Sequence, residues 1–184
     1  DALPPPIQMC DPLSRNMPDE LKTIVANCLA HGRRPFVDVV DAFPKEVEYV
    51  LKALEEVYKN DATARTQKLS PEARLRFHQA ESGPVMKDLR EWMTRQIDQR
   101  LVEPNSGLGE AILYMTKRWD KFTLFLRKAG APLDNNICER ALKKAILHRK
   151  NSLFYKTLNG AHLGDLYMSL IYTAELAGVN PFDY

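Results

Sequence analysis

The sequence predicts a mainly α fold, a helical bundle or array with at most a small residual β-sheet. Three observations favour it: long stretches in which apolar residues recur at helical spacing, proline and glycine residues that separate those stretches, and only two short segments that suit strands. The chain of 184 residues is long enough for one domain with a sizeable core. Its 45% hydrophobic and 27% charged residues are ordinary for a globular protein.

Both candidate strands lie near the N-terminus. Residues 4–6 are prolines and suit an extended entry, and Ile7–Cys10 is a short, mostly apolar run that ends at Asp11. Residues 21–30 mix β-branched and other apolar side chains. They would suit a buried strand or a helix, and we favour the strand.

Helical periodicity begins after these strands. Apolar residues between positions 47 and 58 recur at the spacing of one helix face, and the polar residues 61–69 predict a connector. Ser-Pro-Glu at residues 70–72 is typical of a helix start, because serine can cap the first turn and proline suits its first position. Ser-Gly-Pro at residues 82–84 predicts that this helix breaks and another begins.

Three longer apolar stripes follow, and we expect their methionine and aromatic side chains to pack in the core. The stripes cover residues 85–101, 108–126 and 163–177. Residues 103–107 predict a turn between the first two. Gly130 and Pro132 end the second stripe, since glycine caps helix ends and proline cannot continue them.

The cysteines and the hydropathy exclude several classes of protein. Cys10, Cys28 and Cys138 are too scattered for a disulfide framework, which favours a reducing compartment. Cys28 and His31 have the spacing of half a zinc site, but no second pair of ligands follows at similar spacing, so we expect no zinc. No apolar run reaches the ~18 residues of a membrane span, no signal peptide is recognisable, and the opening without methionine reads as a fragment.

Two features near the N-terminus have both a functional and a plain interpretation. Asp11 follows a predicted strand, where catalytic carboxylates often lie, but taken alone it is better explained as a turn residue before Pro12. Arg33 and Arg34 could clamp a phosphate, because each guanidinium can donate to two oxygens, or could form a solvated basic patch. The net charge of +2 permits a nucleic-acid partner without requiring one.

The segment LDNNICER, residues 133–140, places an asparagine pair and a glutamate at a predicted helix start. Asn136 and Glu139 fit an N-x-x-E capping box, which requires no function. From Arg140 to Lys156 the chain contains no acid, and so one-sided a stretch favours an anionic partner. The candidate nucleic-acid-binding residues are Arg33, Arg34, Asn135, Asn136, Arg140, Lys143, Arg149, Lys150 and Asn151.

These motifs together resemble the insertion-sequence-66 family of transposases. Its C-terminal signature is LDNN followed by ER, then RKN, a Gly-Ala pair and a closing helix that ends in V-x-P, all present in PLDNNICER…RKN…GAH…GVNP. The blocks MCDPLSRN and ANCLAHGRRPFVD resemble the preceding part of the same family. The resemblance covers both ends of the chain and leaves a divergent helical middle.

The resemblance implies a DDE-type transposase on a ribonuclease H-like core, in which three carboxylates hold Mg²⁺ or Mn²⁺ ions for DNA strand cleavage and strand transfer. Asp11 matches the second acid and Glu139 the last; both would be catalytic and metal-binding. The first acid would lie on a strand outside this chain, so we expect the fragment to be inactive alone and to bind no metal. The implied partners are DNA at the transposon ends and target, and further copies of the protein, in the bacterial cytoplasm at the nucleoid.

The predicted organisation is a single domain over residues 1–184. Residues 1–32 would be a remnant of the core, residues 36–130 a helical insertion, and residues 131–184 a C-terminal helical part that carries the last acid. The alternative is a non-catalytic helical module with a basic face that binds DNA or self-associates.

Overall fold

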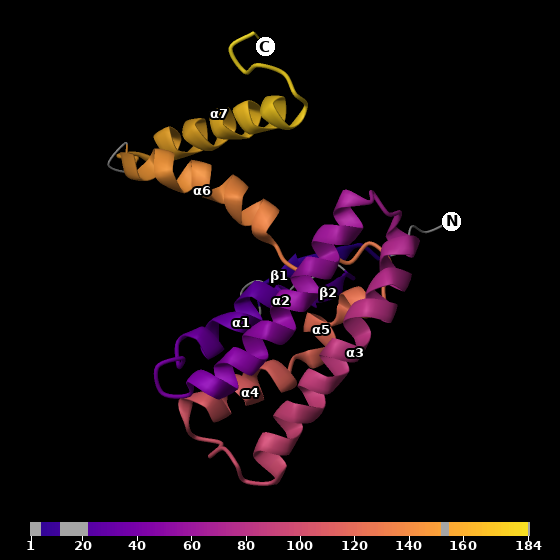
Figure 1. Cartoon of the computed structure of the whole chain (residues 1–184). Helices are drawn as coiled ribbons and strands as arrows, with labels where there is room; N and C mark the ends of the chain where they lie inside the picture. The colour runs from indigo at the N-terminus through magenta and orange to yellow at the C-terminus, as the bar shows by residue number, and fades with distance from the viewer. Residues whose placement is uncertain (1–4, 12–21, 152–154, 184) are drawn as a thin grey trace. The chain divides into compact units, whose positions relative to one another are not determined.

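The computed structural model describes residues 5–11, 22–151 and 155–183 (Figure 1). Its internal contacts divide the chain into two compact units, Asp1–Asn135 and Asn136–Tyr184. The predicted mainly α fold is confirmed: the described residues are mostly helical, and the sheet they contain has two strands.

The two predicted strands exist and pair with each other. β1 (Ile7–Cys10) and β2 (Ile24–Asn27) are parallel, in a register that sets Ile7 beside Ile24 and Cys10 beside Asn27. The second strand is shorter than predicted, because the chain turns at Cys28 and enters helix α1 (Leu29–Val37). The Leu29 amide donates to the Leu133 carbonyl at 2.9 Å, which anchors this turn to a distant loop.

Two long helices, α2 (Pro44–Thr66) and α3 (Pro71–Asp98), pack side by side as a hairpin (Figure 1). The helix start at Ser70 is confirmed, since its hydroxyl accepts a hydrogen bond from the Ala73 amide. The prediction of a polar connector over residues 61–69 is wrong for residues 61–66, which are helical. α2 continues to Thr66 because Asp61 and Ala64 are buried on it.

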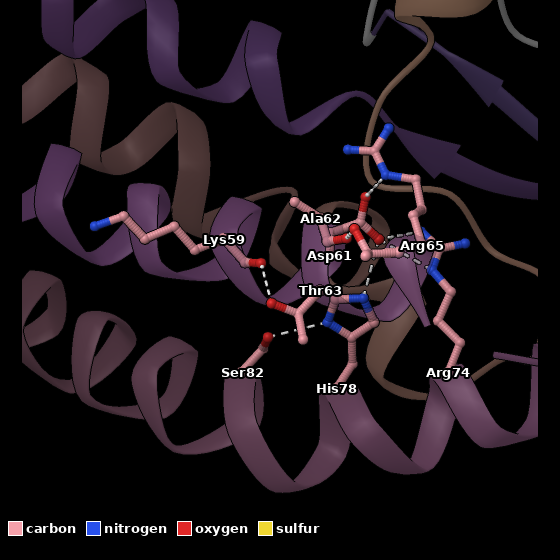
Figure 2. Close-up of polar contacts among 9 residues, drawn as sticks. Lys59, Asp61, Ala62, Thr63, Arg65, Arg74, His78 and Ser82 are labelled. Atoms are coloured by element: carbon pink, nitrogen blue, oxygen red, sulfur yellow. Dashed lines mark hydrogen bonds and ion pairs between the residues drawn. The ribbon is translucent and has the colours of Figure 1, made fainter. Parts of the chain in front are cut away.

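The polar groups in this stretch form a network between the two helices (Figure 2). Arg74 donates to Asp61 Oδ1 through Nε at 3.0 Å and Nη2 at 2.6 Å, and Arg65 Nε lies 3.1 Å from Asp61 Oδ2. His78 Nε2 lies 3.2 Å from Asp61 Oδ1, and its Nδ1 lies 3.0 Å from Ser82 Oγ. A polar sequence therefore stays helical here because its carboxylate has partners on the neighbouring helix.

The break predicted at residues 82–84 is wrong, because α3 passes through Ser82, Gly83 and Pro84 without interruption. Pro84 lacks the amide hydrogen that a helix interior normally uses. Ser82 is fully buried and accepts a hydrogen bond from Asn60 of α2, and Met86 beyond the proline is also buried. Packing and side-chain hydrogen bonds against α2 thus offset the missing backbone bond.

The apolar stripe predicted over residues 108–126 folds as three short helices in place of one. These are α4 (Gly107–Thr116), α5 (Trp119–Phe122) and the 3₁₀ helix η2 (Leu124–Leu126). Its side chains are core, as predicted: Leu108, Ile112, Met115 and Phe122 are almost fully buried. α4 packs on α1 and α3, and α5 packs on β2, so this helical segment contacts the strands directly.

The second unit contains α6 (Asn136–Asn151) and α7 (Leu158–Leu176). The prediction that the last apolar stripe is core is wrong in this structure. Leu163, Leu166 and Tyr167 each expose more than half of their surface, and Ala174 is the only side chain classed as buried among the described residues of α7. None of the helices in the described part of the chain has both the length and the hydropathy needed to cross a lipid bilayer.

Candidate active site at the ends of the parallel strands

Asp11 lies at the carboxyl edge of the two-stranded sheet. It directly follows Cys10, the last residue of β1, and Cys10 pairs with Asn27, the last residue of β2. Asn27 is buried and its Nδ2 donates to the Cys10 carbonyl at 3.4 Å, which ties the two strand ends together. In open sheets with parallel strands, ligands bind at this edge, and the position therefore suits a functional carboxylate.

Two side chains hold the Asp11 carboxylate. His31, in the first turn of α1, places Nδ1 3.1 Å from Asp11 Oδ1, and Asn135 Nδ2 donates to the same oxygen at 3.0 Å. Both contacts are made to Oδ1, so neither uses Oδ2. The Asp11 side chain is 25% exposed and that of His31 19%, which leaves the carboxylate within reach of solvent or a ligand.

The loop before α6 determines where Asn135 lies. Ala131 and Leu133 are buried in the core of the first unit, and the Leu133 carbonyl accepts the Leu29 amide at the start of α1. α1 also carries His31. This backbone hydrogen bond therefore fixes the loop that holds Asn135 to the helix that holds His31, and both residues contact Asp11. The first asparagine of LDNN thus has a structural partner that the capping interpretation did not supply.

Charges near this edge affect the neighbouring thiol and phenol groups. Burial and the Asp11 charge raise the pKa of the Cys10 thiol, while Lys121 lowers it. Burial raises the pKa of Tyr114 in α4, the Arg118 charge lowers it, and Asp11 raises it. The Asp11 charge therefore acts on Tyr114 of α4.

The structure brings together two of the predicted site residues, Asp11 and Asn135, within the first unit. Arg33 and Arg34 are exposed on α1, beyond His31. Glu139 lies in the first turn of α6, half-buried, as the sequence predicts for a helix-start acid. The remaining predicted residues are all on α6 and exposed: Asn136, Arg140, Lys143, Arg149, Lys150 and Asn151.

Sequence reasoning missed the role of His31. It was weighed only as half of a zinc pair with Cys28, yet its ring contacts Asp11 and Cys28 is fully buried. It also did not single out Tyr114, whose pKa responds to the Asp11 charge, or Arg118, whose charge acts on Tyr114. Both residues lie in a segment interpreted as core. The signal present in the sequence was the run KRWDK at residues 117–121, which interrupts the apolar stripe with three cations.

Comparison with protein families matches residues 15–163 to the model described as "Transposase IS66 family". The chain belongs to the IS66 family of transposases. The predicted family is confirmed, and the match spans the segment from Arg33 through Asn135 and Glu139 to the end of α6.

Relatives of this IS66-family chain occur in Sinorhizobium fredii (strain NBRC 101917 / NGR234). The uncharacterized protein y4jD is 37% identical over 161 residues, covering 86% of this chain and 30% of y4jD. The uncharacterized protein y4hP is 32% identical over 167 residues, covering 85% of this chain and 30% of y4hP. The chain therefore spans about 30% of the length of these relatives. No solved structure matches it.

Proposed function

We propose that this chain supplies two carboxylates, Asp11 and Glu139, to the metal site of a DDE transposase that cuts and joins DNA. The observation that supports it most is the position of Asp11 at the carboxyl edge of a parallel strand pair, bonded to Asn135 of the LDNN motif. Glu139 follows Asn135 by four residues. An extended chain spans at most ~3.3–3.6 Å per residue, so the covalent chain keeps Glu139 within reach of that edge.

The donor set suits a hard divalent ion. Carboxylate oxygens are the ligands that Mg²⁺ and Mn²⁺ prefer. Asp11 and Glu139 would hold such ions, which would supply activation of the attacking hydroxyl and stabilisation of charge on the leaving oxygen. We propose a ribonuclease H-like core for the whole protein, with the remaining carboxylate on a strand outside residues 1–184.

In this proposal His31 and Asn135 position Asp11. Their contacts to Oδ1 hold the carboxylate in one orientation and direct Oδ2 to a ligand. Supporting contacts of this kind matter because partners that orient a metal ligand typically affect metal affinity by about 10–100-fold.

Binding of Mn²⁺ to a whole transposase that contains this chain, monitored by the loss of the free-ion signal in electron paramagnetic resonance, tests the shared site. Asp11→Asn and Glu139→Gln should each weaken binding by about tenfold or more, because each removes a charged ligand. Asp38→Asn, an exposed acid at the end of α1, is the matched control and should bind as the wild type does. Unchanged affinity in Asp11→Asn would contradict the site, and unchanged affinity in Glu139→Gln alone would contradict the pairing.

A second candidate function is a DNA-binding module without chemistry, favoured by the exposed cations of α6. Replacing Arg149 and Lys150 with alanine should weaken binding to duplexes of any sequence, because phosphate contacts carry no sequence information. The slope of log affinity against log salt concentration should fall by about two. The same test applies to Arg33 and Arg34. An unchanged slope would identify either pair as solvated surface.

A further inference from the structure

A cationic pocket lies on the helical insertion, outside the residues assigned to the site. It has a volume of about 240 Å³ and is lined by residues of α3 and of the α4–α5 segment. Its lining residues are Arg90, Thr116, Lys117, Arg118, Trp119, Asp120 and Lys121. Four of these side chains are cations and one is an acid, so the pocket favours an anion.

Aromatic rings support both arginines of this pocket. The Arg118 guanidinium carbon lies 4.5 Å from the Tyr114 ring centroid, and its Nη1 donates to the Tyr114 carbonyl at 3.3 Å. The Arg90 guanidinium carbon lies 5.8 Å from the ring centroid of Trp119, which is itself buried. A guanidinium that lies over an aromatic ring is held in one orientation. The N–H groups at its edge can then donate hydrogen bonds to an oxyanion.

These cations differ from the lysines of the long helices. Lys52 and Lys59 pair with Glu48 and Glu55 at 2.7 Å and 2.8 Å. Within the described ranges, neither Arg118 nor Lys121 forms an ion pair with a carboxylate. An anionic ligand in the pocket would reduce the mutual repulsion of these cations.

The pocket borders the Asp11 edge of the sheet. α5, which carries Lys121, packs on β2. Burial raises the pKa of Tyr114, the ring that supports Arg118; the Arg118 charge lowers it, and the Asp11 charge raises it. A polymer that reaches Asp11 with one phosphate could therefore place another in this pocket.

We propose that the pocket formed by Arg90, Lys117, Arg118 and Lys121 binds a backbone phosphate of DNA beside Asp11. Arg118 provides a planar fork suited to two phosphate oxygens, and Lys117 and Lys121 provide point charges. The inference rests on the proposed function only for the identity of the polymer. It makes the insertion a substrate-holding element that contributes to the site in addition to spacing its two acids.

The test compares an Arg118→Ala/Lys121→Ala variant with the wild-type chain, using fluorescence anisotropy of a labelled random-sequence DNA duplex in EDTA. Without divalent metal, the carboxylate site cannot contribute through an ion. We expect affinity at 0.1 M salt to fall by about tenfold and the salt slope to fall by about two, one for each phosphate-contacting cation removed. The matched control is Lys52→Ala/Lys59→Ala, which removes the same number of cations from paired positions and should change neither quantity appreciably.

The outcomes separate the two proposals. A double variant with the affinity and slope of the control pair overturns the pocket and leaves the metal site standing. Absence of DNA binding by the wild type overturns the DNA partner of both. If circular dichroism shows the double variant unfolded, Arg118→Lys and Lys121→Ala are measured singly. Arg118→Lys should weaken binding a few-fold at an unchanged slope, and Lys121→Ala should lower the slope by about one. Wild-type values in both overturn the pocket.

Discussion

Replacing Asp61 with alanine is expected to lower the free energy of unfolding by about 3–5 kcal/mol. The carboxylate is 7% exposed and accepts hydrogen bonds from Arg74 through two nitrogens, with Arg65 and His78 also in contact. His78 is 1% exposed, so the variant leaves its ring and the Arg74 charge between the two helices without their acceptor. Guanidinium chloride unfolding monitored by circular dichroism measures the change.

An exposed ion pair on the same helix is the control for Asp61. Glu55 and Lys59 are 2.8 Å apart, and both side chains are more than half exposed. Because solvent and salt screen an exposed ion pair, Glu55→Ala should change the free energy of unfolding only slightly. A loss below about 1 kcal/mol for Asp61→Ala would mean that the helices repack without the network.

The same carboxylate makes stability depend on pH. Burial raises the pKa of Asp61, but hydrogen bonds from His78 and Arg74 outweigh it and the pKa is lowered. A group whose pKa is lower in the folded state contributes stability that is complete above its unfolded pKa and is lost as the pH falls toward the folded value. The wild type should therefore lose more stability between pH 6 and pH 3 than Asp61→Asn does. Equal losses would contradict this assignment.

Asp11→Asn, introduced into a whole transposase that contains this chain, is expected to lower the rate of DNA strand transfer roughly a thousandfold. Loss of a carboxylate ligand removes several kcal/mol of transition-state stabilisation, and each ~1.4 kcal/mol is a factor of ten in rate. The isosteric amide retains the shape and can still accept a hydrogen bond at Oδ1, so the contacts of His31 and Asn135 should survive. Strand transfer on labelled DNA ends in Mg²⁺ is the measurement.

The matched variant for Asp11 is again Asp38→Asn, which should retain full activity. DNA binding in EDTA should be unaffected in Asp11→Asn, since the loss is assigned to chemistry. Strand transfer within about tenfold of wild type would show that Asp11 is not a metal ligand of the reaction. A parallel loss of DNA binding would instead assign Asp11 to substrate recognition.

The sequence allowed the prediction of features that depend on neighbouring residues. Strand Ile7–Cys10, the Ser70 cap and the Glu139 helix start were predictable because short apolar runs, capping residues and first-turn acids are local signals. The His31 contact with Asp11 joins residues twenty positions apart, and the Asn135 contact joins residues 124 positions apart. No local pattern specifies such pairs.

Two errors have the same physical origin. Residues 61–66 looked like a connector and Ser82 to Pro84 like a break, because both are judged unfavourable in an isolated helix. In the structure both segments lie against the partner helix of the α2–α3 pair: Asp61 contacts Arg74 and His78 of α3, and Asn60 of α2 donates to Ser82. Tertiary hydrogen bonds and burial outweighed local propensity in both places. The apolar stripe of α7 shows a different limit of sequence reasoning. A periodic pattern identifies a helix, but it does not show which element packs on the apolar face of that helix.

The 124-residue separation between Asp11 and Asn135 has a consequence for the order of folding. The α2–α3 pair is made of contacts between neighbours in sequence, which form quickly, whereas the Asp11 cluster requires the closure of a very long loop. We therefore expect the hairpin to assemble first and the carboxylate cluster late. The entropy of closing a loop rises only with the logarithm of its length, about 0.6 kcal/mol per doubling. The helical segment can therefore lengthen or shorten between relatives at little thermodynamic cost to the cluster that it separates.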